Sequence, residues 1–213
     1  MKYISKSVLI LFLIPLMSFA NNDKKKHEKK RIIQKEYNVN KDATVRLNNR
    51  YGNLTLTTWD ENRVEIEVEI IVKGNDLEQV ELKLSTIDVV FKASNSLVDA
   101  ETIFEKNKSN WSWWSGNNNL NYEINYRVKL PVTNHVDLNN DYGNIYLDVL
   151  EGKASINCDY GKISIGELKN TSNTINLDYC SGSTVSYIEN GSVNIDYSKL
   201  TIDDAKNIRL NMD

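Results

Sequence analysis

The chain has 213 residues, of which 40% are hydrophobic and 26% are charged, and its formal net charge is −3. From Ile32 onward, 18 basic residues stand against 27 acidic ones, a net charge of −9. This balance excludes the basic folded face that a nucleic-acid-binding domain needs, whereas the length allows one or two domains with a buried core.

The first twenty residues are typical of a secretory signal peptide. Lys2 and Lys6 form its charged start, Val8 to Phe19 its apolar run, and Ser18 and Ala20 are the small residues before cleavage. The apolar run is shorter than the roughly 20 residues of a membrane-spanning helix. We therefore expect an exported protein in the periplasm, at the cell surface or secreted, without a transmembrane segment after signal removal. An uncleaved N-terminal anchor is the alternative.

Residues 21–35 carry a cluster of positive charge. The cluster consists of Lys24, Lys25, Lys26, Lys29, Lys30 and Arg31. Such a run predicts a disordered, solvated leader. A second interpretation is electrostatic attachment to anionic lipid or polysaccharide at the cell surface.

Residues 36–135 read as a β-rich region that contains a first repeat and an insertion. Val64 to Val72 alternates apolar residues with Glu, as a strand exposed on one face does. Asn75 to Thr86 fits a short helix with Asp76 as its N-cap, although a strand fits its apolar residues equally well. Further strands are expected at 89–93, 97–104 and 122–130.

Three tryptophans lie in a polar stretch of this region, at Trp111, Trp113 and Trp114. Aromatic side chains in a polar loop can stack on sugar rings or contact a membrane or a partner. They are therefore candidate ligand-binding residues. The alternative is that the loop folds back and plugs an open end of the core.

Residues 136–213 contain a tandem repeat of about 18 residues, marked by Asn-x-Asp-Tyr. Its tyrosines recur at spacings of 18, 19 and 18. The repeated residues are Asn139, Asp141 and Tyr142; Asn157, Asp159 and Tyr160; Asn176, Asp178 and Tyr179; and Asn194, Asp196 and Tyr197. Leu47 to Leu54 partly matches the first of these units. Self-similarity at a fixed period is typical of repeat architectures.

Each unit reads as two short alternating strands, which can bury their apolar face only by stacking on neighbouring units. The repeat therefore predicts a mainly all-β fold, a parallel β-solenoid or β-helix of two-strand repeats. Apolar columns and tyrosines are expected inside, and the Asn and Asp columns outside. Cys158 then faces inward and Cys180 lies in an outward turn, so we expect no disulfide between them.

The four repeated aspartates, Asp141, Asp159, Asp178 and Asp196, form a candidate cation ladder. Stacked about 4.8 Å apart, carboxylates repel one another unless basic side chains, asparagines or bound cations offset the charge. Calcium is the cation that such oxygen ligands suit. The alternative is that Asn and Asp simply favour strand ends and solvate the surface. No other cofactor is expected.

The sequence lacks the usual catalytic patterns. Its histidines are His27 and His135, so a histidine-based triad would have to use His135. Neither a metal-type Cys/His spacing nor a phosphate-binding Gly loop is present. We therefore expect no enzyme.

With these motifs, the chain resembles the bacterial putative-adhesin family of exported β-solenoid proteins. The resemblance rests on Tyr-Gly-x-Ile/Leu units at Tyr51, Tyr142 and Tyr160, on the variants at Tyr179 and Tyr197, and on the signal peptide. It implies a location in the cell envelope or outside the cell and an adhesive role. It assigns no functional residues.

Three functions follow as hypotheses. The first is an adhesin-like module that binds glycan or envelope protein through the Asn/Asp surface and the Trp loop. The second is a periplasmic structural or envelope-sensing protein, and the third a polysaccharide-active enzyme. Because a solenoid needs a polar cap and Asn211 to Asp213 begin a further unit, the pattern also predicts a fragment, or a last coil covered by a partner or by self-association.

Overall fold

The computed structural model describes residues 26–105 and 120–212. Its elements are β1 (His27–Asn38), β2 (Thr44–Arg50), β3 (Leu54–Trp59), β4 (Arg63–Gly74), α1 (Leu77–Thr86), β5 (Ile87–Ser94), β6 (Leu97–Phe104), β7 (Asn121–Pro131), β8 (His135–Asp141), β9 (Asn144–Leu150), β10 (Ala154–Asp159), β11 (Lys162–Leu168), β12 (Asn173–Asp178), β13 (Ser183–Asp196) and β14 (Leu200–Met212).

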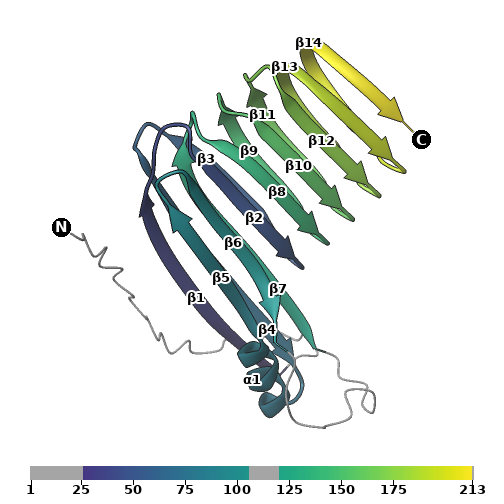
Figure 1. Ribbon diagram of the computed structural model, residues 1–213. Coiled ribbons are helices and arrows are strands. Elements are labelled where there is room, and N and C mark those ends of the chain that lie inside the picture. The colour runs from purple at the N-terminus through teal and green to yellow at the C-terminus, as the bar shows by residue number, and fades with distance from the viewer. Residues whose placement is uncertain (1–25, 106–119, 213) are drawn as a thin grey trace, which may run out of the picture.

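The strands form one mixed sheet of 14 strands that folds back on itself (Figure 1). Its order is β1-β4-β7-β3-β9-β11-β13-β12-β10-β8-β2-β6-β5, with β14 paired to β13. The fold-back lies at β13, whose first part pairs with β11 and whose second part pairs with β12. At the other end, Arg31 of β1 donates a hydrogen bond to the carbonyl of Ile87 on β5. The sheet is therefore nearly closed around its core.

The predicted parallel β-solenoid is wrong as the fold of this chain. β1 pairs antiparallel with β4, β4 with β7, and β5 with β6 within the same sheet as the repeats. The 12-residue β1 and β4 are held by cross-strand charge pairs, such as Lys30 with Glu69 at 3.0 Å. Since five of the 14 strands, β1, β4, β5, β6 and β7, lie outside the 18-residue repeat, its period does not determine how they pair.

Within the mixed sheet, the repeated residues do lie side by side. β8, β10, β12 and the second part of β13 are parallel neighbours, and β2 precedes them. Their register places Leu138, Ile156, Ile175 and Val193 in one buried row. Polar residues alternate with these and lie on the outer face. This row forms one wall of the core.

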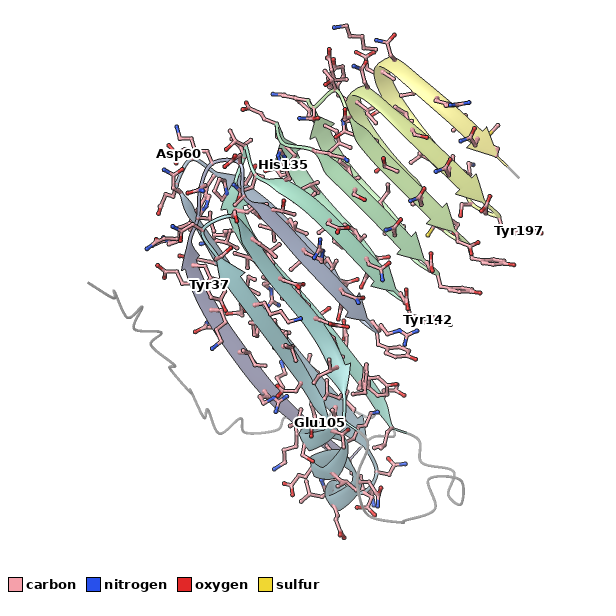
Figure 2. All side chains as sticks on the ribbon, viewed as in Figure 1. Tyr37, Asp60, Glu105, His135, Tyr142 and Tyr197 are labelled. Carbon is pink, nitrogen blue, oxygen red and sulfur yellow. The ribbon has the colours of Figure 1, made fainter. Side chains whose placement is uncertain are left out.

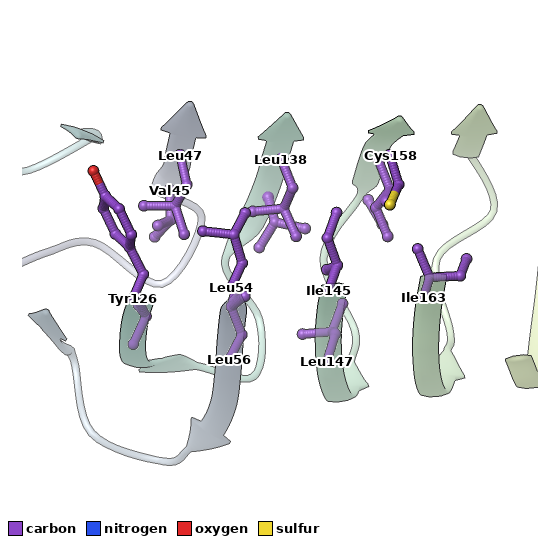
Figure 3. Packing of buried hydrophobic residues seen from close by; sticks show 14 of the residues in the cluster. Val45, Leu47, Leu54, Leu56, Tyr126, Leu138, Ile145, Leu147, Cys158 and Ile163 are labelled. Carbon is purple, nitrogen blue, oxygen red and sulfur yellow. The ribbon is translucent and has the colours of Figure 1, made fainter. Parts of the chain in front are cut away.

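The core lies between the two layers of the sheet. Figure 3 shows Leu54, Ile145 and Ile163 of one layer facing Leu47, Leu138 and Cys158 of the other. All six are fully buried. Every second side chain of each strand points inward, so the inward side chains of the two layers together fill the space between them.

One part of this core is polar. Asn49 is fully buried and donates through Nδ2 to the carbonyl of Ile124 at 3.0 Å and to Oδ1 of Asn140 at 3.1 Å. Asn49 Oδ1 accepts from the Thr102 hydroxyl at 2.9 Å, and that hydroxyl lies 2.7 Å from the Tyr126 hydroxyl. Buried polar groups are tolerated when they are paired in this way.

The insertion contains the predicted helix. α1 follows Asp76, whose carboxylate accepts the backbone N–H of Glu78 at 2.9 Å and of Gln79 at 3.2 Å, so the helix interpretation is confirmed and the strand alternative is not. Buried Val80 fixes α1 against the end of β4. The strands expected at 64–72, 89–93, 97–104 and 122–130 are present as β4 to β7.

The predicted disordered leader is wrong from residue 27 onward, because His27–Asn38 is strand β1. Charged side chains of β1 have partners on other elements: Lys29 Nζ lies 2.8 Å from a carboxylate oxygen of Glu81 in α1, and Glu28 pairs with Lys73 of β4 at 2.9 Å. The described part of the chain contains no helix long and apolar enough to cross a membrane.

Candidate functional site: a polar face bordered by stacked tyrosines

Five tyrosines form a continuous stack along one corner of the molecule. This tyrosine ladder consists of Tyr51, Tyr142, Tyr160, Tyr179 and Tyr197. Neighbouring ring centroids are 5.0 to 5.4 Å apart, and their planes differ by 3 to 9°. Figure 2 shows Tyr142 and Tyr197 projecting outward from the strand ends. Because the faces of the inner rings cover each other, Tyr142, Tyr160 and Tyr179 present ring edges and hydroxyls to solvent.

The prediction that the tyrosines face inward is wrong. Tyr142, Tyr160 and Tyr179 are 50, 51 and 49% exposed, and Tyr197 is 74% exposed. Every ladder tyrosine has a positive φ, between 48 and 63°, a conformation that L-residues rarely adopt. The left-handed turn breaks the strand alternation at the corner and directs the side chain outward, although residues two positions earlier point inward.

The corner conformation is held by backbone contacts between successive repeats. The Tyr142 N–H donates to the carbonyl of Asp159 at 2.9 Å, and the Tyr160 N–H to that of Asp178 at 3.0 Å. Glycine follows the tyrosine in three of the five corners, after Tyr51, Tyr142 and Tyr160. There the backbones approach closely: a Cβ on Gly161 would lie 1.9 Å from the carbonyl oxygen of Gly143. These contacts set the spacing of the rings.

An asparagine ladder runs parallel to the tyrosines on the outer face. It consists of Asn48, Asn139, Asn157, Asn176, Asn194 and Asn211, which occupy equivalent positions of neighbouring strands. Side-chain amides donate along it: Asn139 to Asn48 at 3.1 Å, Asn176 to Asn157 at 2.5 Å, and Asn211 to Asn194 at 2.6 Å. The amides therefore have one fixed orientation over these repeats.

An aspartate column, made of Asp141, Asp159, Asp178 and Asp196, lies between these two ladders. Arg50 offsets the negative charge at one end of the column, since the Nε of Arg50 lies 2.7 Å from Oδ2 of Asp141. Partial burial and the neighbouring Asp141 and Asp178 carboxylates raise the pKa of Asp159 above its ordinary value. Like charges thus lie next to one another along the column.

The candidate cation ladder is a single row in the structure. Among residues 26–105 and 120–212, no three His, Cys, Asp or Glu side chains are grouped so that they could hold a metal ion. Calcium binding by the aspartate column stays a prediction.

The first end of the tyrosine ladder abuts an aromatic cluster. Tyr51 packs edge-on against Phe104 and Tyr122, with centroids 6.0 and 5.0 Å away. Lys83 Nζ lies 4.2 Å from the centroid of Tyr122 and 5.1 Å from that of Phe104, and desolvation lowers the pKa of Lys83. The candidate binding residues Trp111, Trp113 and Trp114 lie outside the described residues.

Both cysteines are free thiols in the structure, and the predicted outward position of Cys180 is wrong. Both cysteines are buried. Cys180 occupies the position that Gly161 has in the previous repeat, and its Sγ lies 3.0 Å from the carbonyl oxygen of Cys158. The side chain turns into the corner instead of toward solvent. His135 lies at the start of β8, where its Nδ1 accepts the N–H of Lys153 at 2.9 Å.

Sequence reasoning placed the Asn and Asp columns and missed the exposed tyrosine ladder. The signal that could have found it is the invariant Tyr at the end of a strand, directly before Gly in three units. A residue at such a corner need not follow the strand's alternation.

No family model and no curated protein matches the chain. Several solved structures resemble it. A putative cell adhesion protein from Clostridium sporogenes is 13% identical, with 87% of this chain and 100% of that chain covered and a TM-score of 0.36. A putative adhesin from Bacteroides fragilis is 10% identical, with 85 and 95% covered and a TM-score of 0.35.

A putative lipid binding protein from Parabacteroides distasonis is 11% identical, with 85% of this chain and 78% of that chain covered and a TM-score of 0.36. Structures described as adhesins are thus among those similar to this chain.

Proposed function

We propose that the protein is a non-enzymatic, adhesin-like binding protein of the cell envelope or cell exterior, and that its outer face holds an extended neutral polysaccharide. The supporting observation is the common register of three columns: asparagine amides, aspartate carboxylates and tyrosine edges repeat together at the 5.0 Å spacing of the rings. A ligand with a regular repeat can meet equivalent groups at successive strands.

The chemistry of the face favours a polyhydroxylated ligand. Carboxylates accept hydrogen bonds, amides donate and accept, and the tyrosine hydroxyl does both, so sugar hydroxyls find partners in each column. The aspartate column carries net negative charge, and Arg50 pairs with only one member of it. Like charges repel, so the face disfavours anionic polymers and suits neutral ones.

Binding to insoluble neutral polysaccharide from bacterial envelopes, measured by co-sedimentation, tests this proposal. Asp159→Asn and Tyr160→Ala are each expected to weaken binding about tenfold, because each removes contacts of about 1.4 kcal/mol. Asp159→Asn also removes carboxylate repulsion, so the folded state should be at least as stable as wild type. Weaker binding by this variant would therefore not reflect unfolding.

Ser164→Ala provides the matched control, because Ser164 lies on the outer face of the opposite layer, in β11. It should bind as wild type does. Equal losses in all three variants, or no co-sedimentation of the wild type with any neutral polysaccharide, would overturn the proposal.

A further inference from the structure

The last strand of the sheet has an open edge. β14 pairs with β13 along 11 residue pairs, and no other described strand pairs with β14. Its apolar side chains lack the cover that their equivalents have: Leu210 is 44% and Met212 68% exposed, whereas Val193, the partner of Leu210, is buried. An uncovered edge of this kind is a template for a further strand.

The shape of β14 restricts what can pair with it. β14 follows β13 around the fold-back, so residues 200–205 form one leg and residues 207–212 the other, with Lys206 between them. The two legs are equal in length. A two-fold axis through the bend, perpendicular to the direction of stacking, therefore places each leg of one copy antiparallel against the other leg of a second copy.

We propose that β14 is a self-association surface and that its occupant is the β14 strand of a second copy, paired about a two-fold axis at Lys206. Such an interface is isologous, with each residue pair occurring twice. In this register Ile202 opposes Leu210 and Leu200 opposes Met212. All four belong to the core-facing side of the strand, since Ile202 and Leu210 continue the buried positions Val185 and Val193.

The outward side chains of β14 match in the same register. Asp203 opposes Arg209, and Thr201 opposes Asn211. The first pair joins opposite charges and the second joins two hydrogen-bonding groups, each occurring twice. Shifting the register by one residue would bring core-facing side chains opposite outward ones. The pairing thus covers Ile202, Leu210 and Met212. It also places an Asp203 carboxylate opposite each of the two Arg209 side chains.

A charge exchange tests the pairing in the 213-residue chain by sedimentation velocity over a concentration series. Wild type should show a reversible monomer–dimer equilibrium. Asp203→Arg and Arg209→Asp should each raise the dimer dissociation constant about tenfold or more, because two attractive pairs become two repulsive ones. The double variant Asp203→Arg/Arg209→Asp restores opposite charges and should regain the wild-type constant.

Thr174→Asp adds a charge to the outer face of β12, away from the edge, and should leave the equilibrium unchanged. The proposal fails if wild type is monomeric at every concentration, or if the double variant dimerises no better than the single ones. Open-ended polymers in place of dimers would also overturn it, because they require a head-to-tail contact instead of a two-fold one.

Discussion

Gly161→Ala is expected to lower the free energy of unfolding by about 3 kcal/mol, at the upper end of the range for overpacking. The added Cβ would lie 1.9 Å from the Gly143 carbonyl oxygen and 2.8 Å from its carbonyl carbon. Both are backbone atoms of the neighbouring repeat. They can move only if the hydrogen bonds that hold the adjoining tyrosine corners lengthen. Urea denaturation followed by circular dichroism measures the loss.

Gly182→Ala is the control that separates the cost of the steric contact from the cost of replacing a glycine elsewhere. Gly182 has a φ of 73°, and a Cβ there would meet nothing within 4 Å. Its substitution should cost only the left-handed strain, about 1 kcal/mol. If Gly161→Ala proved no more destabilising than Gly182→Ala, the close stacking of the corners would be refuted.

Asn49→Leu is expected to destabilise the protein by about 3 kcal/mol, although it adds an apolar side chain to the core. The substitution removes the donor to the Ile124 carbonyl and to Asn140 Oδ1, and the acceptor for the Thr102 hydroxyl. A buried polar group without a partner costs about 1–3 kcal/mol. Thr102 keeps Tyr126 as a partner, which limits the loss.

The neighbouring residue Asn48 offers a matched control for this substitution. Asn48 belongs to the same strand but lies on its outer face, where its Oδ1 accepts from Asn139 at 3.1 Å. Asn48→Leu should therefore cost less than about 1 kcal/mol, since water can replace the lost partner. Equal midpoints in urea for the two variants would show that the buried network contributes nothing.

The sequence was sufficient to predict those features that depend on neighbouring residues or on the repeat. Asp76 indicated the start of α1 because an N-cap acts on the next few residues. The spacing of 18 or 19 residues between Leu138, Ile156 and Ile175 indicated which residues share a row, since equivalent residues of successive repeats come into register. The Asn and Asp columns followed from the same register.

The sequence was insufficient to predict which strands pair when those strands are far apart in the chain. The alternation at Val64 to Val72 marks a strand with one buried face, but it does not say that β1 and β7 are the neighbours. The acidic stripe of Glu65, Glu67 and Glu69 was the available hint, because Gln34, Lys30 and Arg127 pair with it across the sheet. Reading those charges as cross-strand partners would have predicted β1 instead of a disordered leader.

The tyrosine ladder was misplaced for a different reason. Strand alternation places Tyr142 on the same side as Asn140, and Asn140 is indeed buried. The left-handed conformation at Tyr142 reverses the direction of its side chain, and no propensity rule assigns that conformation to a bulky residue. Only the backbone contacts between repeats reveal it.

Hydroxyl-radical footprinting of the protein with and without bound neutral polysaccharide distinguishes which layer of the sheet is the binding surface. The outer face should be covered, so Tyr142, Tyr160 and Tyr179 should become protected. Tyr146 and Tyr187 lie on the opposite layer, in β9 and β13, and should react equally in both samples. Protection of Tyr146 and Tyr187 with unchanged reactivity of the tyrosine ladder would contradict the assignment of this face as the binding surface.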